Sequence, residues 1–477
     1  MEIKEVDVAI IGAGTAGLNA MREVEKAGRS WVLIESHKYG TTCARVGCMP
    51  SKLLIAAAES AHQVEQSHVF GINAGQIQVD GRVVMERVRK FRDEFAGGVV
   101  RNTEALPEER RPRGRARFTG PNTLQVGDDL EVKAKAFVVA TGSSTTIPEP
   151  FQAVKDDVLT SESIFEIETL PESMAVIGTG VIGLELGQAF SRLGVRVAVY
   201  GRSRSLKPFT DPRVQDYARE VLGQELDLRQ ETTITNVTRT DGGFELTWRK
   251  SDGSEHRETF AKILVATGRK SNLADLNLEA TGLSLYEQGR PPWNPRTMQC
   301  GDHPIFLAGD VSEYRPLLHE AADEGRIAGQ NSALYPEVTA HVRRTPLTIV
   351  FTDPQMALAG KSFAELANDS IEVSEVSFED QGRSKVMAVN RGLVRLYAHR
   401  EDCTLVGAEM FGPRVEHMSH LLAWTIQQRL SVQQILEFPF YHPVFEEGLR
   451  TAFREMVKKL KMAGGGRCEE RAESAGM

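Results

Sequence analysis

The chain has 477 residues, and its 65 acidic and 57 basic residues give a formal net charge of −8. This length allows two or three domains, and the acidic balance argues against nucleic acid or an anionic membrane as a partner. Because no apolar run reaches the roughly 18 residues that span a bilayer, and the first residues lack the basic segment of a signal peptide, we expect a cytoplasmic protein.

The first predicted strand, residues 6–11 (VDVAII), leads directly into Gly12, Gly14 and Gly17. A helical stretch follows, and then a second strand, SWVLIE, which ends in Glu35. This order is the dinucleotide-binding pattern, in which the glycines allow a tight turn, a close approach of the pyrophosphate and close packing of helix on strand. The pyrophosphate would lie at the helix N-terminus, and Glu35 would accept hydrogen bonds from a ribose.

Two cysteines separated by four residues, Cys43 and Cys48, follow in the run GTTCARVGCMPSKLL, which is predicted to open a helix. They can form a disulfide if the turn between them brings their Cα atoms within about 7 Å. A helix N-terminus near Pro50 would lower a thiol pKa and favour the thiolate. The alternative is two small buried residues. Arg45 lies between them and could stabilise a thiolate or select an anionic substrate or carrier.

The dinucleotide pattern recurs in MAVIGTGVIGLELGQAF, which is followed by the strand VRVAVY. Each copy is also followed by a strand that ends in Ala-Thr-Gly. The repeated residues are Gly178, Gly180 and Gly183 in the second turn, Thr141 and Gly142 after the first copy, and Gly268 after the second. An internal repeat of this kind implies two nucleotide sites, and therefore two dinucleotide cofactors that exchange electrons.

The two copies differ at the end of the second strand. Where the first copy has Glu35, the second has the run Tyr200-Gly201-Arg202-Ser203-Arg204, which contains no carboxylate. Arginine fits a 2′-phosphate, so this difference slightly favours NADP(H). NAD(H) stays open as the alternative, with the arginines facing solvent.

The rest of the chain contains two further candidate site residues, Asp310 and His442, and a segment with a different pattern of strands and helices. IFLAGDV places Asp310 at a strand end before the predicted helix PLLHEAADEGRIAGQN. TPLTIVFTDPQMALAG, GLVRLYAH and TLVGAEMFG alternate like antiparallel strands, and HMSHLLAWTIQQRL and EEGLRTAFREMVKKL have amphipathic helical periodicity. FYHPVFEEG places His442 five residues before Glu447, and a carboxylate that orients an imidazole raises its basicity. Cys300 and Cys403 show no metal-ligand spacing, so no metal site is predicted.

These motifs together resemble the class I flavin-dependent pyridine nucleotide–disulfide oxidoreductases, from about residue 5 to residue 460 and in the same order. The resemblance implies an α/β fold, with two Rossmann-like three-layer ββα dinucleotide-binding domains and a C-terminal α+β dimerisation domain. The implied parts are an FAD-binding domain at 1–150, an NAD(P)-binding domain at 151–275, a central part at 276–340 that returns to the FAD domain, an α+β interface domain at 341–460 and a disordered tail at 461–477. Cys468 in the tail is treated as incidental.

The resemblance also implies residue roles. Asp310 would bond the ribitol chain of FAD, while Lys52 and Glu185 would pair beside the flavin. His442, oriented by Glu447, would be the acid–base partner of the cysteine pair, donated from the other subunit of a homodimer.

Within this family the sequence most resembles dihydrolipoamide dehydrogenase. That similarity implies electron transfer between a dithiol, free or on a lipoylated carrier protein, and NAD or NADP. The Gly-Gly that usually precedes the first cysteine is Thr41-Thr42 here, which leaves the substrate open. Two alternatives remain: an NADPH-dependent reductase of a small disulfide or metal ion, and a non-catalytic flavoprotein redox-sensing subunit.

Overall fold

The first sheet of the computed structural model, which describes residues 2–287 and 289–462, is built around strand β1 (Glu2–Ile11). β1 pairs in parallel with β2 (Trp31–Ile34) and with β5 (Leu130–Val139). The end of β5 also pairs in parallel with β15 (Ile305–Leu307), so a strand from far along the chain completes this sheet. The start of β5 pairs with β4 (Thr123–Val126), which pairs with β3 (Ala116–Gly120), both antiparallel.

Both faces of this sheet are buried, which is why β1 contains the continuous apolar run VAII. Val8 and Ile10 pack under helices α1 (Thr15–Lys26) and α7 (Leu318–Leu334). Ala9 and Ile11 pack on the opposite side, in the core that includes β3 and β4. The sheet is therefore the middle layer between helices and antiparallel strands.

Helices α1 and α7 cross at very close range. A Cβ atom at Gly325 would lie 2.2 Å from the carbonyl oxygen of Ala16, and one at Gly329 would lie 2.5 Å from that of Ala20. Glycine is therefore required at both positions for the two backbones to touch. This contact joins the segment after β15 firmly to the N-terminal unit.

The second sheet repeats the parallel arrangement of the first. Its strands, in spatial order, are β13 (Lys262–Val265), β7 (Ser173–Ile177), β8 (Arg196–Tyr200) and β9 (Asp227–Arg229). An antiparallel sheet of β10 (Thr232–Thr240), β11 (Gly243–Lys250) and β12 (Glu255–Phe260) packs on one face. The other face packs against α5 (Val181–Arg192), α3 (Cys48–Gln66) and α4 (Gly81–Glu104). The two nucleotide units are joined by the pairing of β6 (Ser143–Thr145) with β14 (Arg269–Ser271).

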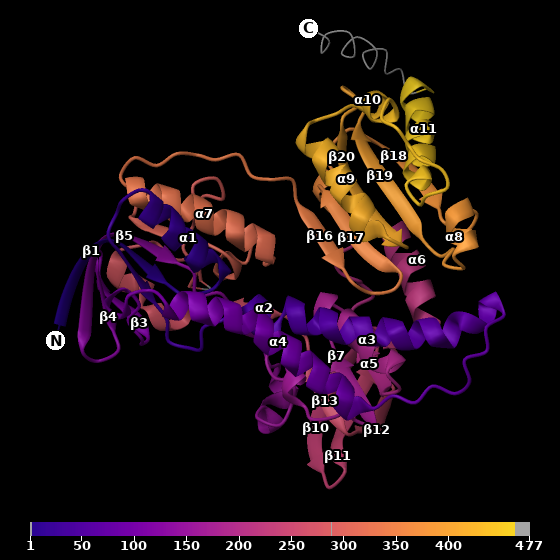
Figure 1. Ribbon diagram of the computed structural model, residues 1–477, viewed down its shortest axis with the longest axis horizontal. Helices are drawn as coiled ribbons and strands as arrows, with labels where there is room; N and C mark the ends of the chain where they lie inside the picture. Colours follow the sequence, from indigo (N-terminus) through magenta and orange to yellow (C-terminus); the bar gives the residue numbers. More distant parts are fainter. Residues whose placement is uncertain (1, 288, 463–477) are drawn as a thin grey trace.

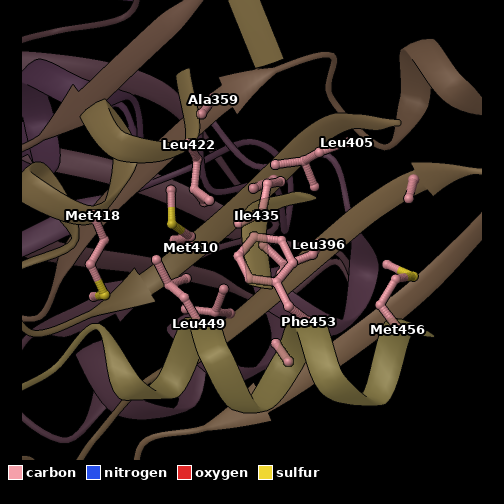
Figure 2. Packing of buried hydrophobic residues seen from close by; sticks show 14 of the residues in the cluster. Ala359, Leu396, Leu405, Met410, Met418, Leu422, Ile435, Leu449, Phe453 and Met456 are labelled. Carbon is pink, nitrogen blue, oxygen red and sulfur yellow. The ribbon is translucent and has the colours of Figure 1, made fainter. Parts of the chain in front are cut away.

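The C-terminal unit contains an antiparallel sheet in the order β16-β17-β20-β19-β18. Its strands are β16 (Leu347–Val350), β17 (Gln355–Gly360), β18 (Ile371–Ser377), β19 (Leu393–His399) and β20 (Leu405–Gly412), and its helices are α8 (Gly382–Val386), α9 (Val415–Gln427), α10 (Val432–Leu436) and α11 (Glu447–Met462). Figure 2 shows residues of α9, α10 and α11 packed on this sheet around Phe453. β18 was not among the predicted strands.

Figure 1 shows how the three units are arranged. The N-terminal unit lies at the left, the second unit at lower centre and the C-terminal unit at upper right, while α3 and α4 run across the middle. Helix α6 (Pro212–Gly223) of the second unit packs against residues of β19 and β20. Phe351, which directly follows β16, packs against the core that α3 shares with α5, so the C-terminal unit also contacts this core.

Side-chain caps explain where several helices begin. The Asp80 carboxylate accepts the N–H groups of Arg82 and Val83 at the start of α4, each at 3.1 Å. Ser431 and Gln434 form a reciprocal capping box at the start of α10. These bonds satisfy N–H groups that lack a partner within the helix.

The predicted fold class is confirmed: an α/β chain with two Rossmann-like units and a C-terminal α+β unit. The predicted disordered tail begins too early, because residues 461 and 462 end helix α11. The rest of that predicted tail, with Cys468, lies outside the described residues. Among the helices that the structure describes, none combines the length and apolarity needed to cross a membrane.

Candidate active site

A cavity of about 1530 Å³ lies between the first sheet, the start of α3, α5 and the C-terminal unit. It brings together ten of the predicted site residues: Gly12, Gly14, Glu35, Cys43, Cys48, Lys52, Thr141, Gly142, Glu185 and Asp310. The other predicted residues do not line it: Gly17, Gly178, Gly180, Gly183, Arg202, Arg204, Gly268, His442 and Glu447.

The first glycine turn has the shape that a pyrophosphate requires. Gly12 has φ +107°, and a Cβ atom there would lie 2.3 Å from the carbonyl oxygen of Ala140. A Cβ atom at Gly17 would lie 1.8 Å from the carbonyl oxygen of Gly12, so helix and turn touch backbone to backbone. Nothing lies within 4 Å of a Cβ atom placed on Gly14, which leaves the backbone at the start of α1 open to the cavity. This cradle fits a dinucleotide phosphate.

Glu35 follows β2 and is held rigidly at the cavity wall. Its Oε2 accepts the N–H of Ala13 at 2.9 Å, and its Oε1 accepts the N–H of His37 at 2.8 Å. A carboxylate oxygen can accept more than one hydrogen bond, so both oxygens keep capacity for a ribose diol. The first unit therefore presents both ends of a dinucleotide site, phosphate and ribose, to one cavity.

Asp310 also lines the cavity. It lies in a turn that is supported by a buried ionic network. Its Oδ2 accepts a hydrogen bond from Ser143 Oγ at 3.2 Å. The N–H of the preceding Gly309, which has φ +85°, donates to Glu324 Oε2 at 2.8 Å. Burial raises the pKa of Glu324 to about 7, although Arg343, 3.2 Å from Oε1, acts in the opposite direction. Neither Glu324 nor Arg343 was predicted, because no local motif marks a contact between α7 and the residues before β16.

The second glycine turn has the same geometry as the first. Gly178 has φ +123°, and a Cβ atom there would lie 2.3 Å from the carbonyl oxygen of Ala266. A Cβ atom at Gly183 would lie 2.0 Å from the carbonyl oxygen of Gly178, while one at Gly180 would meet nothing within 4 Å. The backbone is again open at the start of a helix, here α5.

The ribose end of the second unit differs from the first. Tyr200, the last residue of β8, is buried, and its hydroxyl accepts a hydrogen bond from Arg229 at 2.7 Å. Arg202 and Arg204 follow on an exposed loop. This loop lies against the glycine turn, because Thr179 Oγ1 donates to the carbonyl oxygen of Ser205 at 3.2 Å. Both arginines therefore lie on a loop that is anchored to the second glycine turn.

The cysteine run was predicted to open one helix, and the structure divides it into two. Cys43 lies in the short helix α2 (Thr42–Val46), whereas Cys48 is the first residue of α3. Gly47 separates them, and a Cβ atom there would lie only 3.1 Å from Cys43 Cα. The break turns the two thiols toward each other at the start of α3.

The two thiols differ strongly in acidity. Both are free cysteines, and the hydrogen bond from Cys43 lowers the pKa of Cys48 to about 7, with the Lys52 ammonium acting in the same direction. The same hydrogen bond, together with burial, raises the pKa of Cys43. At neutral pH the thiolate therefore resides on Cys48, at a helix N-terminus.

Lys52 and Glu185 form the ion pair that the family resemblance implied. Lys52 Nζ lies 2.7 Å from Glu185 Oε2, and the Glu185 side chain is only 5% exposed. Glu185 Oε1 accepts the backbone N–H of Phe351 at 2.8 Å. Lys52 lies near the start of α3. At the cavity wall it contacts Glu185 of α5 and Phe351, in the segment after β16.

Arg45 is tied to the loop that precedes it. Its guanidinium donates to the carbonyl oxygen of Lys38 at 2.9 Å, and its stem covers Gly40. The charge of Lys52 favours the thiolate form of both cysteines, although the pKa of Cys43 is raised overall. Lys52 is therefore the cation that supports thiolate stabilisation, one of the two roles considered for Arg45.

His442 and Glu447 contact each other but lie away from the cavity of their own chain. His442 Nδ1 is 3.0 Å from Glu447 Oε1, and this hydrogen bond lowers the pKa of Glu447. A loop between them makes the contact possible, because Glu447 is the first residue of α11. The His442 side chain is 80% exposed, so its imidazole is open to a second molecule.

The described ranges, 2–287 and 289–462, contain no group of three or more His, Cys, Asp or Glu side chains placed to hold a metal ion.

Comparison with known proteins identifies matches along almost all of the chain. Residues 6–325 match the family described as pyridine nucleotide-disulphide oxidoreductase, and residues 347–453 match the dimerisation domain of that family. A mercuric reductase from Shigella flexneri is 31% identical over 96% of this chain and 82% of its own length. A dihydrolipoyl dehydrogenase from Haloferax volcanii is 29% identical over 94% of this chain and 95% of its own length. The solved structure of LpdA from Mycobacterium tuberculosis shares the fold, with a TM-score of 0.81 and 22% identity over 95% of this chain and 99% of that one.

Proposed function

This chain belongs to the pyridine nucleotide-disulphide oxidoreductase family, and from that premise we propose that it moves an electron pair between a dithiol and a nicotinamide through Cys43 and Cys48. The family uses FAD and NAD(P)H, as the two nucleotide patterns in the sequence predicted. The chain also carries the dimerisation domain of the family.

The first unit would hold FAD. Its open glycine turn, Glu35 and Asp310 face one cavity, which supports binding of the pyrophosphate, the ribose and the ribitol respectively. When bound, FAD supplies the electron-carrying ring between the reduced cysteine pair and the nicotinamide. The second glycine turn would hold the nicotinamide nucleotide, with Arg202 and Arg204 favouring NADP(H).

The acidity difference between the thiols supports a direction for the exchange. A substrate thiolate would attack Cys43 Sγ, the Cys43–Cys48 bond would break, and Cys48 would leave as the thiolate. The thiol with the lower pKa is the better leaving group, and Cys48 has that lower pKa. The second substrate thiolate then attacks the substrate sulfur of the mixed disulfide and releases Cys43. The substrate leaves as a disulfide, and the enzyme keeps the electron pair as two thiols.

Each attack by a neutral dithiol requires removal of a proton. His442 of the partner subunit would accept it in the proposed homodimer, while the partner's Glu447 stabilises the imidazolium that forms. The exposure of the His442–Glu447 pair, away from the cavity of its own chain, supports donation across an interface.

The observation that carries the proposal is the asymmetric thiol pair on the wall of a dinucleotide-sized cavity. Anaerobic titration of the flavin-loaded protein with dihydrolipoamide is the test. We expect a long-wavelength absorption band at two-electron reduction, from the Cys48 thiolate against the flavin. An unchanged flavin spectrum with dihydrolipoamide, in protein that NADPH reduces, would contradict dithiol oxidation.

A second candidate is NADPH-dependent reduction of a small disulfide or a metal ion. The two exposed arginines and the similarity to a mercuric reductase favour it. Steady-state assays with lipoamide, glutathione disulfide and mercuric ion, each with NADH and with NADPH, separate the candidates. Flavin-loaded protein that turns over none of these would favour a redox-sensing subunit.

A further inference from the structure

Phe351 contacts both members of the Lys52–Glu185 pair. It directly follows β16 and lines the cavity. Its backbone N–H donates to Glu185 Oε1 at 2.8 Å, and the centroid of its ring lies 4.4 Å from Lys52 Nζ. Lys52 Nζ in turn lies 2.7 Å from Glu185 Oε2. The three residues form a closed triangle, in which each contacts the other two.

This triangle lies next to the reactive thiol. Lys52 follows Cys48 by four residues on α3, so the two side chains share one face of the helix. The charge of Lys52 lowers the pKa of Cys48, whereas the charge of Glu185 raises it. The Lys52 ammonium therefore adds to the larger effect of the Cys43 hydrogen bond in favouring the Cys48 thiolate.

The segment that carries Phe351 is fastened to α5 by buried polar groups. The Gln188 side chain accepts the N–H of Asp353 at 2.8 Å and donates to its carbonyl oxygen, also at 2.8 Å. Arg192, whose side chain is 4% exposed, lies 3.0 Å from the Asp353 carboxylate. Displacing Phe351 would strain these contacts, and unpaired buried polar groups are costly. The ring is therefore held in place independently of Lys52.

We propose that Phe351 is a positioning residue, whose ring and N–H hold the Lys52 ammonium against Glu185, one helical turn from Cys48. An aromatic face attracts a cation through its quadrupole, whereas an aliphatic side chain of similar size does not. Through this contact the C-terminal unit sets the nucleophilicity of Cys48. The inference deepens the proposed function and rests on the assigned role of Cys48.

The test measures the thiol directly. Flavin-loaded protein is reduced, excess reductant is removed, and the rate of Cys48 alkylation by iodoacetamide is followed by peptide mass spectrometry. We expect Phe351→Leu to lower this rate about threefold at pH 7, because less of the thiol is ionised. Phe351→Tyr keeps the aromatic face and should keep the wild-type rate. No dithiol, metal ion or nicotinamide enters the assay, so its result is independent of whether the proposed substrate is correct.

A double-mutant cycle shows whether Phe351 acts through Lys52. In a Lys52→Met background, Phe351→Leu should cause no further fall in the alkylation rate. Phe190→Leu is the matched control, since Phe190 packs in the same core as α3 but does not line the cavity; its alkylation rate should equal that of the wild type. If Phe351→Leu does not fold, Phe351→Met supplies a second non-aromatic side chain.

Three results would overturn the proposal. They are a wild-type rate in the non-aromatic variants, an equal loss in Phe351→Tyr and Phe351→Leu, and a loss of the same size in the Lys52→Met background. Each would assign Phe351 a packing role alone.

Discussion

The two glycine turns of this chain have nearly the same backbone, yet their surroundings differ completely. A Cβ atom at Gly12 or at Gly178 would lie 2.3 Å from a carbonyl oxygen of the strand beside it, Ala140 or Ala266. Gly14 and Gly180 both leave the backbone open before a helix. Gly12 and Gly14 of the first turn line the large cavity with the cysteine pair. The glycines of the second turn do not, and only Val181 and Ile182 between them reach its wall.

The glycine turn that would hold a phosphate is therefore common to both units, whereas the residues at the end of the following strand distinguish one nucleotide from another. In the first unit Glu35 is braced by the N–H groups of Ala13 and His37. In the second unit the strand ends in Tyr200, whose hydroxyl accepts a hydrogen bond from Arg229. The exposed residues Arg202 and Arg204 follow it. Substitutions in the two units should therefore have separable effects.

Cys48→Ser should have the largest effect, because it removes the leaving thiolate from the first unit only. We expect dithiol turnover to fall by at least about a thousandfold, while flavin stays bound and NAD(P)H still reduces it. Stopped-flow flavin reduction and steady-state assays measure the two halves separately. Cys300→Ala, at a buried position in the core of the first sheet, is the control and should remain active. Full dithiol activity of Cys48→Ser would refute the exchange mechanism.

Glu35→Ala should weaken FAD binding about a hundredfold, because it removes the ribose acceptor and leaves two backbone N–H groups unpaired. Equilibrium dialysis followed by flavin absorbance gives the dissociation constant. The affinity for the nicotinamide nucleotide, measured on protein reloaded with FAD, should not change. Equal losses at both sites would show that the two units are not independent.

The alkylation rate of reduced Cys48 should rise about tenfold from pH 6 to pH 8, because its pKa is lowered to about 7 and only the thiolate reacts. The direction follows from the charge: protonation below that pKa removes the nucleophile. Cys43, whose pKa is raised, should stay largely unreactive over this range. Faster alkylation of Cys43 than of Cys48 would reverse the assigned roles.

Replacing Arg202 and Arg204 together by alanine should raise the KM for NADPH about fivefold to tenfold and change the KM for NADH little, if these side chains bind a 2′-phosphate. Initial rates at constant dithiol or disulfide concentration supply both values. Arg249→Ala, at an exposed position at the end of β11, controls for the loss of positive charge from the same unit. Equal changes for both nucleotides would place the arginines in solvent and favour NAD(H).

Gly180→Ala should give the smallest effect, a rise of about twofold to threefold in the KM for the nucleotide with an unchanged Tm. The new methyl group meets no protein atom within 4 Å, so it can only crowd a bound pyrophosphate. Gly223→Ala, also with nothing within 4 Å, is the control and should leave the KM unchanged. A fall in Tm for Gly180→Ala alone would mean that the open space is not a ligand site.

The features that the sequence predicted are those defined by the spacing of residues within a short segment of the chain. Both glycine turns, Glu35 and the cysteine run are visible because each must occur at a fixed distance from a strand or helix. Phe351 escaped prediction, since its contact with Lys52 exists only after distant units pack, and Arg343 escaped because no local motif marks its contact with Glu324. Gly47 escaped for another reason: a helical pattern gives no sign that a Cβ atom at this position would be tightly packed against Cys43, at 3.1 Å from its Cα. The domain boundaries at 150, 275 and 340 stay predictions.

The close crossing of α1 and α7 has a consequence for biosynthesis. Gly325 and Gly329 lie against the backbone of Ala16 and Ala20, and β15 pairs with β5 in the same sheet. A ribosome must therefore deliver more than two-thirds of the polypeptide before the N-terminal sheet can gain its last parallel strand and its second helix. Until then the apolar surfaces of β5 and α1 stay uncovered, and chaperones would have their greatest effect on the emerging chain during that interval.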